Sequence, residues 1–273
     1  MNSDLAAISH LLRAEGIRLT LLTAGLLLEG QARAVAETID DVIVSLDGPP
    51  DIHDRIRRVP RAFEQLERGV LALRKLRPEM EIRGRSTVQK ANCLCFRGTV
   101  SAARQLELNS ISFLAADITS EAFNRPDGWS TERRSTVALG ADETRMLEQE
   151  VELFIREHEH DIATGFVVES AEKLRRIVRH FQAQLGRRPP VAPRCNAPWV
   201  SAVIEADGTV RPCFFHRPLG NIHEKALMEV VNGEAAVEFR RRLDIANDLI
   251  CQRCVCSLYL PKEGPKDPDV VGR

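Results

Sequence analysis

The sequence predicts an α/β protein whose first part is a parallel sheet with helical crossovers and whose last part is a small cysteine-rich module. Two observations carry this prediction. Strand-like and helix-like segments alternate strictly over about 120 residues, which is typical of parallel strands joined by helices. Five of the seven cysteines then fall within residues 195–256, at spacings that are typical of metal ligands.

The expected elements of the first part follow one another in a regular alternation. They are a helix at residues 4–14, a strand at 17–25, a helix at 32–39, a strand at 40–49, a helix at 62–78, a strand at 81–92, a helix at 97–108 and a strand at 109–118. Each helix has apolar residues three or four positions apart, and each strand is a short, mainly apolar run. Gly16 and Pro78 end the first and third helices, because neither residue continues a helix well.

Small or polar residues follow each expected strand. They are Thr23-Ala24-Gly25, Ser45-Leu46-Asp47-Gly48, Gln89-Lys90-Ala91-Asn92 and Ala115-Ala116-Asp117. In a parallel sheet the carboxyl ends of the strands meet at one edge, where binding and catalytic residues belong. Caps and turns use the same residue types, so a purely structural role is the alternative at each end. The recurrence at four strand ends favours a binding site.

The whole chain is expected to consist of four parts. These are a sheet domain at residues 1–125, a helical connection at 126–190, the cysteine-rich module at 191–260 and a flexible tail at 261–273. In the connection, one helix begins near Asp142 with acidic residues in its first turn, and a second ends near Gly186. The tail is rich in proline and charge, which is typical of a frayed terminus.

The composition excludes several classes of protein. The 38 Lys and Arg residues are balanced by 39 Asp and Glu residues, so the formal net charge is −1. This balance argues against general binding to nucleic acid or to an anionic membrane. No apolar run approaches the roughly 18 residues that a membrane span needs, and the amino-terminal segment lacks the apolar core of a secretion signal. We therefore expect a cytoplasmic protein with no nucleic-acid or membrane partner.

The cysteine spacing indicates a metal centre. Cys195 and Cys213 flank a predicted hairpin, and Cys251, Cys254 and Cys256 form a Cys-x2-Cys-x-Cys series. Two thiolates from a hairpin and two or three from such a knuckle can surround one centre. Disulfides are disfavoured because a cytoplasmic chain keeps its thiols reduced. Four thiolates suit zinc as well as an iron-sulfur cluster, so spacing alone leaves both open.

A resemblance to a known family favours an iron-sulfur cluster over zinc. The pattern Cys195-x12-Gly-x4-Cys213, followed by PLGNI, a helix and Cys251-x2-Cys254, resembles the SPASM or twitch module that follows the core of many radical S-adenosylmethionine (SAM) enzymes. In that family the module binds auxiliary [4Fe-4S] clusters. Because no cysteine follows Cys256, the resemblance implies one auxiliary cluster. Cys195 and Cys213 are then the firmest ligands, Cys251 and Cys254 come next, and Cys256 competes for the same role.

Residues 4–130 resemble the core of the same enzymes, through TAGLLL, VIVSLDGPPDIHD, GRSTVQKAN and SISFLAADI. The implied fold is an incomplete radical SAM (β/α)6-type partial barrel followed by the SPASM/twitch module. In that family, polar residues of the fourth and fifth strands line the SAM pocket. The matching positions here, which the resemblance implies as SAM-binding residues, are Thr23, Ser45, Asp47, Arg85 and Asn92. Asp47 would accept a ribose hydroxyl, and Arg85 would pair with the methionyl carboxylate. No catalytic residue is identified.

Two parts of the family pattern are missing. The sequence lacks the Cys-x3-Cys-x2-Cys loop that holds the SAM-binding cluster, since its first cysteine is Cys93, and it lacks a Gly-Gly-Glu-Pro strand. We expect a truncated sequence in which Met1 is an internal methionine, or else a split enzyme completed by another chain. A second [4Fe-4S] cluster is then expected only in a full-length form, and this chain alone is expected not to cleave SAM. Cys93 and Cys95 are expected to be structural.

The resemblance implies a radical SAM enzyme. The complete protein would cleave SAM reductively to a 5′-deoxyadenosyl radical and modify a peptide or a cofactor precursor. A reductant such as flavodoxin or ferredoxin would supply the electron. Two alternatives remain: a non-catalytic iron-sulfur electron-transfer protein, and a zinc-stabilised binding module.

Overall fold

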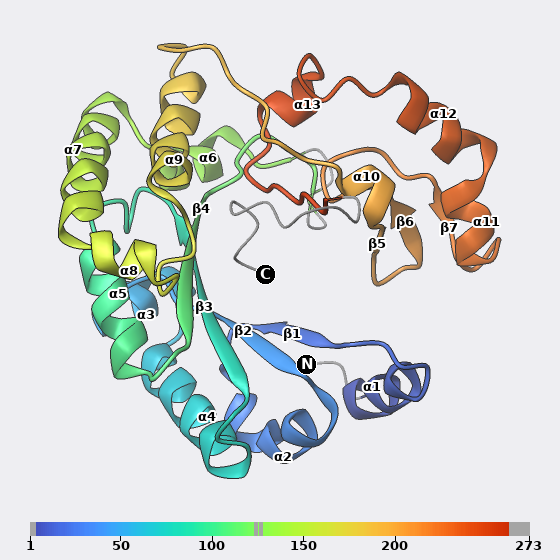
Figure 1. Cartoon of the computed structure of the whole chain (residues 1–273). Helices are drawn as coiled ribbons and strands as arrows, with labels where there is room; N and C mark the ends of the chain where they lie inside the picture. Colours follow the sequence, from blue (N-terminus) through green and yellow to red (C-terminus); the bar gives the residue numbers. More distant parts are fainter. Residues whose placement is uncertain (1–3, 123–124, 126–127, 262–273) are drawn as a thin grey trace. The chain divides into compact units, whose positions relative to one another are not determined.

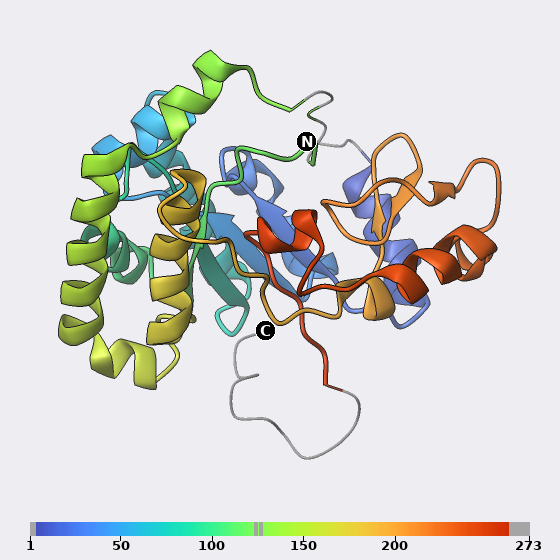
Figure 2. The same ribbon diagram turned by 90° about the horizontal axis from the view of Figure 1, so that it is seen from above.

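The computed structural model describes residues 4–122, 125 and 128–261 and divides into two compact units (Figures 1 and 2). Unit 1 comprises Met1–Leu114 and Leu139–Val178, and unit 2 comprises Ala115–Ala138 and Arg179–Arg273. The expected tail lies outside the described residues except for Pro261. None of the described helices is long and apolar enough to cross a membrane.

A four-stranded sheet organises unit 1, with the strands in the order of the sequence. The strands are β1 (Thr20–Thr23), β2 (Asp41–Ser45), β3 (Glu81–Val88) and β4 (Ser110–Ala115). β1 pairs with β2 and β2 with β3 in parallel, as the alternating pattern predicts. On the far side of β4, a single parallel bridge between Ile111 and Val167 adds a short fifth segment.

Helices before and between the strands cover one face of this curved sheet (Figure 1). They are α1 (Leu5–Ala14), α2 (Leu28–Thr38), α3 (Pro50–Arg57), α4 (Ala62–Leu76) and α5 (Phe96–Gln105). α2 and α4 pack tightly because Gly69 of α4 leaves room for Leu28 of α2, whose Cβ would lie only 2.7 Å from a Cβ at position 69. Leu28, Leu66 and Leu73 are fully buried at this contact, so the helix faces that the apolar spacing predicts are the faces that form the core.

The helical connection supplies further helices to unit 1. They are α7 (Ala141–Glu157), α8 (Glu159–Ala163) and the first part of α9 (Ala171–Gln184). An aromatic cluster joins this connection to the sheet, since Phe154 of α7 lies 5.4 Å from Phe96 and 5.8 Å from Phe113, centroid to centroid. Arg97 and the nearly buried Glu150 form an ion pair of 2.6 Å across α5 and α7.

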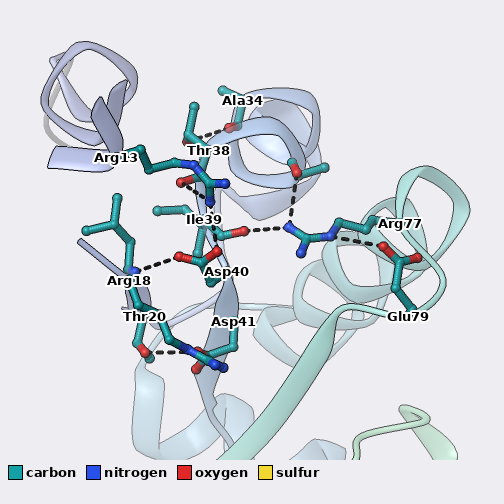
Figure 3. Close-up of polar contacts among 12 residues, drawn as sticks. Arg13, Arg18, Thr20, Ala34, Thr38, Ile39, Asp40, Asp41, Arg77 and Glu79 are labelled. Atoms are coloured by element: carbon teal, nitrogen blue, oxygen red, sulfur yellow. Dashed lines mark hydrogen bonds and ion pairs between the residues drawn. The ribbon is translucent and has the colours of Figure 1, made fainter. Parts of the chain in front are cut away.

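Polar contacts fasten the amino ends of β1 and β2, at the opposite end of the sheet from the predicted binding site (Figure 3). Asp40 accepts the backbone N–H of Leu19 at 2.7 Å and pairs with Arg13 of α1 at 2.8 Å. The buried Asp41 pairs with Arg18 at 3.0 Å and accepts a hydrogen bond from the Thr20 hydroxyl at 3.1 Å. Because both carboxylates join one strand to its neighbour, this end of the sheet is a structural region.

Unit 2 contains short elements only. They are α6 (Thr131–Val137), α10 (Ala197–Val200), β5 (Val203–Ile204), β6 (Thr209–Arg211), β7 (Gly220–Asn221), α11 (Leu227–Asn232), α12 (Glu234–Arg242) and α13 (Leu249–Gln252), with the end of α9. β5, β6 and β7 form an antiparallel sheet. The predicted hairpin turn is present, because Gly208 has a φ of +82° and the Thr209 N–H bonds to the Asp207 carboxylate at 3.0 Å. The first strand of this hairpin, β5, has only two residues, because α10 occupies the residues up to Val200.

Candidate functional site

Four cysteines of unit 2 approach one another from separate segments. Cys195 precedes α10, Cys213 follows β6, Cys251 lies in α13, and Cys254 follows α13. Cys251 and Cys254 are each close enough to Cys195 and Cys213 for the charges of those two thiolates to raise their pKa. All seven cysteines, each within the described residues, are free of disulfide bonds. The structure therefore gathers four of the five predicted ligands in one region.

Cys256 lies beside this group. The Cys254 thiol donates a hydrogen bond to the Cys256 carbonyl oxygen at 2.9 Å, and the Cys256 thiolate is close enough to raise the pKa of Cys254. Cys93 and Cys95 belong to unit 1 and are buried and half-buried. Burial raises the pKa of the Cys93 thiol to about 11, as expected for an inert structural cysteine.

Backbone amides surround two of the gathered sulfurs. The N–H groups of Phe215 and His216 donate to the Cys213 sulfur, which lowers its pKa against the larger effect of burial. The Ala197 N–H donates to the Cys195 sulfur at 3.4 Å. Amide donors of this kind favour the charged thiolate, and the thiolate is the form that ligates a metal. The local backbone therefore suits metal-bound sulfur at both positions.

The surroundings of the other two sulfurs raise their pKa as well. Burial raises the pKa of Cys251 to about 12, with the Asp248 carboxylate adding to the effect. Burial and the Cys256 thiolate raise the pKa of Cys254 still further. A metal centre would displace both protons, because coordination to a cation outweighs the cost of a buried thiolate. Metal binding at this site would therefore release protons.

One group of possible ligand atoms lies close together beside the cysteines. Two ligands on one tetrahedral zinc ion lie about 3.3 to 3.8 Å apart, given bonds of about 2.0 to 2.3 Å. Among the described residues, a single set of three potential ligand atoms lies within 4.8 Å, from His216, Asp248 and Cys251. No three of the cysteine sulfurs are that close. By ligand type, the four thiols suit an iron-sulfur cluster and a zinc ion equally.

At the other end of the chain, the strand register decides which predicted SAM residues share a face of the sheet. Ser45 pairs with Arg85, so both side chains lie on the face away from the helices, and the Arg85 side chain reaches Ser112 at 3.4 Å. Thr23 pairs with the buried Val44. Its side chain therefore lies on the helix-covered face, where its hydroxyl accepts the Gly25 N–H at 3.1 Å. The structure brings Ser45 and Arg85 together and leaves Thr23 apart from them.

Asp47 and Asn92 make buried structural contacts just beyond the strands. The Asp47 carboxylate pairs with Arg57 at 2.7 Å and lies 3.8 Å from the His53 ring. Burial raises the pKa of Asp47, although Arg57 opposes this. The Asn92 amide donates to the carbonyls of Asp47 and Thr87 at 2.9 and 3.1 Å. These two residues brace the loops after β2 and β3 against each other.

Two residues that the sequence analysis overlooked have unusual surroundings. Glu169 accepts the Phe113 N–H at 2.7 Å beside β4, and burial raises its pKa to about 7. Its position near a helix start gave no sign of this, because the contact depends on an isolated strand bridge. His216 is buried, and its Nε2 lies 3.4 Å from the Cys251 sulfur. The Cys213-x2-His216 spacing is a metal-ligand signal that could have identified it.

Comparisons with known proteins agree with this arrangement. Residues 195–255 match the SPASM family model, an iron-sulfur cluster-binding domain. No curated protein sequence matches the chain. A solved structure of anSMEcpe with bound AdoMet is similar to this chain, with a TM-score of 0.58, 18% identity and coverage of 85% of this chain and 61% of that one.

Two further solved structures contain peptides. In anSMEcpe with bound AdoMet and Kp18Cys peptide, the TM-score is 0.54 at 20% identity, and the match covers 82% of this chain and 59% of that one. In Streptococcus suis SuiB bound to the precursor peptide SuiA, the TM-score is 0.54 at 12% identity, with 94% and 58% covered. The chain thus spans about three fifths of the length of these proteins.

These findings define the class of the protein as an α/β partial barrel joined to a small cysteine-rich module, as predicted. Residues 195–255 match the SPASM iron-sulfur cluster-binding domain, and the chain shares the fold of anSMEcpe and SuiB.

Proposed function

We propose that residues 191–260 bind one auxiliary [4Fe-4S] cluster through Cys195, Cys213, Cys251 and Cys254. The observation that carries this proposal is the convergence of four thiols from three segments of the chain, within residues that match an iron-sulfur cluster-binding domain. The amide donors at Cys213 add support, because they lower the pKa of its thiol against the effect of burial, and the Ala197 N–H donates to the Cys195 sulfur. Cys256 is the alternative to Cys254 as the fourth ligand.

We further propose that the sheet of unit 1 belongs to an enzyme that binds SAM at the carboxyl ends of its strands. Arg85 and Ser45 would contact the methionyl part of SAM, since they share the open face of the sheet. Asp47 and Asn92 would hold the neighbouring loops in place, and Thr23 would stabilise the turn that contains Gly25. When bound with an iron-sulfur cluster, SAM supplies a 5′-deoxyadenosyl radical after reductive cleavage.

The proposed substrate is a peptide, with a small cofactor precursor as the alternative. Support comes from the peptides bound in the similar anSMEcpe and SuiB structures. A cytoplasmic reductant such as flavodoxin or ferredoxin would supply electrons to the clusters. The whole reaction would belong to a protein longer than this chain, because the similar proteins extend well beyond the matched part.

The deciding experiment measures iron, acid-labile sulfide and zinc per chain, on protein purified and reconstituted without oxygen. About four iron and four sulfide are expected, as one cubane requires. Cys213→Ala should lose this iron, whereas the matched control Cys95→Ala, at a half-buried thiol of unit 1, should keep it. One zinc without sulfide would refute the cluster and favour the zinc-stabilised module.

The fourth ligand and the SAM site need separate measurements. Cys254→Ala should lose iron and Cys256→Ala should retain it, and the reverse result would assign the fourth position to Cys256. For SAM, calorimetric titration should show binding that Arg85→Ala weakens by about tenfold or more, as expected when a charge-assisted contact is lost. Equal affinity in both proteins would remove Arg85 from the SAM site.

A further inference from the structure

His216 lies against the predicted ligand set without belonging to it. Its ring is buried, and its Nε2 is 3.4 Å from the sulfur of Cys251 and 3.8 Å from Oδ1 of Asp248. The ring also packs edge-on against Phe239, with centroids 4.9 Å apart. The cysteine pattern does not explain why a buried imidazole nitrogen is directed at a predicted ligand sulfur.

The loop that carries His216 connects two of the predicted ligands. Its backbone N–H donates to the Cys213 sulfur, and its side chain reaches the Cys251 sulfur in α13. The Arg211 side chain fixes the loop from the other side, by donating to the His216 carbonyl at 3.1 Å. One short loop thus contacts sulfurs from two separate segments.

The 3.4 Å contact excludes His216 as a further ligand of the same cubane. Each iron of such a cluster takes one protein ligand, so two ligands of one cubane are held on different irons and stand farther apart than two ligands of one ion. A nitrogen and a sulfur at 3.4 Å could share a single zinc ion, but no second cysteine sulfur of the described residues lies within 4.8 Å of both atoms. A hydrogen bond accounts for the distance without moving either side chain.

The competing acceptor for the His216 proton is already in use. Asp248 caps α13, with its Oδ1 accepting the N–H groups of Ile250 and Cys251 at 2.9 and 2.8 Å. At 3.8 Å from Nε2 it is too far for a good hydrogen bond. The Cys251 sulfur is therefore the nearer acceptor, and it gains acceptor strength when it becomes a thiolate.

We propose that the Nε2–H of His216 donates a hydrogen bond to the Cys251 thiolate of the auxiliary cluster and so raises the reduction potential of that cluster. His216 is then a positioning residue. Reduction adds one electron to the cluster and increases the negative charge on its sulfurs, and a donor at a ligand sulfur stabilises that charge. This inference rests on the proposed cluster and concerns its potential rather than its presence.

The test compares midpoint potentials in protein reconstituted without oxygen, by titrating the cluster with dithionite and following its electron paramagnetic resonance signal. His216→Phe keeps a ring against Phe239 but removes the donor, and it should shift the potential to a more negative value. His216→Gln restores an N–H donor, so its midpoint potential should lie between those of His216→Phe and the wild type. The control His223→Phe changes an exposed histidine of the same module and should leave the potential unchanged.

Iron and sulfide content separates the possible outcomes. Full content with a more negative potential in His216→Phe supports the hydrogen bond, and if that variant fails to fold, the shift in His216→Gln decides. An unchanged potential in the folded variants overturns the proposal. Loss of iron and sulfide from both variants would overturn it in favour of direct ligation. A wild-type chain without iron or sulfide would instead refute the proposed cluster itself.

Discussion

Replacing Glu169 by Gln tests whether a half-buried carboxylate costs stability beside β4. The pKa of Glu169 is raised from 4.5 to about 7, mainly by burial, while Lys173 and Arg85 oppose the shift. The Gln side chain can still accept the Phe113 N–H, which the carboxylate accepts at 2.7 Å. The substitution therefore removes the charge and keeps the hydrogen bond.

The sign of the effect follows from proton binding. Because the folded-state pKa is the higher one, the folded protein binds more protons than the unfolded chain between pH 4.5 and 7. The free energy of unfolding of the wild type therefore falls as the pH rises through this range. A shift of this size corresponds to at most about 3 kcal/mol, at 1.36 kcal/mol per unit.

The assay is urea denaturation at a series of pH values, followed by far-ultraviolet circular dichroism. Glu169→Gln should be the more stable protein at pH 8, and its advantage should shrink steadily toward pH 5.5. Glu148→Gln, at an exposed position of α7, is the control and should track the wild type. A constant difference between Glu169→Gln and the wild type across the pH range would refute the burial argument.

Three further predictions concern other parts of the chain. Asp40→Ala should lower the free energy of unfolding by about 1–3 kcal/mol, because it leaves the Leu19 N–H without its acceptor. Since the pKa of Asp40 is lowered in the fold, this loss of stability should be present at neutral pH and should shrink as the pH falls through that pKa. Gly208→Ala should cost about 1–3 kcal/mol in urea denaturation, because the turn needs a positive φ and a Cβ would lie 2.6 Å from the His223 ring; an unchanged midpoint would contradict this. The 273-residue chain should yield no 5′-deoxyadenosine from SAM under dithionite, and chromatographic detection of that product would disprove the expectation.

The sheet could be predicted from the sequence because its elements are long and periodic. β1 to β4 all lie within the predicted strands, and α4 begins at the predicted residue. α3 was missed as a separate helix, although Pro50 at its first position is a helix-start signal. β7 and α10 have two and four residues, which is too short for any periodicity to appear. The bridge at Val167 depends on its partner strand, so no local pattern could indicate it.

The sequence predicts those parts of the candidate site whose position depends only on the spacing of residues along the chain. Cys251 and Cys254 are three residues apart, so a single turn brings both to one region. The separation of Thr23 from Ser45 was not predictable, because a shift of one residue in strand pairing moves a side chain to the other face of a sheet. His216 approaches Cys251 across 35 residues of sequence, and only the packing of α12 and α13 around the loop determines that contact.

The packing of the cysteine module explains why its metal should also be a structural requirement. Among the described residues after position 190, the buried apolar side chains are three prolines (Pro193, Pro198 and Pro212) and those of Ala197, Val210, Val230 and Ala236. Alanine and valine bury little area, and about 25 cal/mol per Å2 of buried apolar surface cannot offset the conformational entropy of some 70 ordered residues. Larger side chains of the module, including Trp199 and Phe214, remain exposed. A centre that ties the segments of Cys195, Cys213 and Cys251 together would supply the missing free energy, so loss of the metal should unfold this module rather than merely empty it.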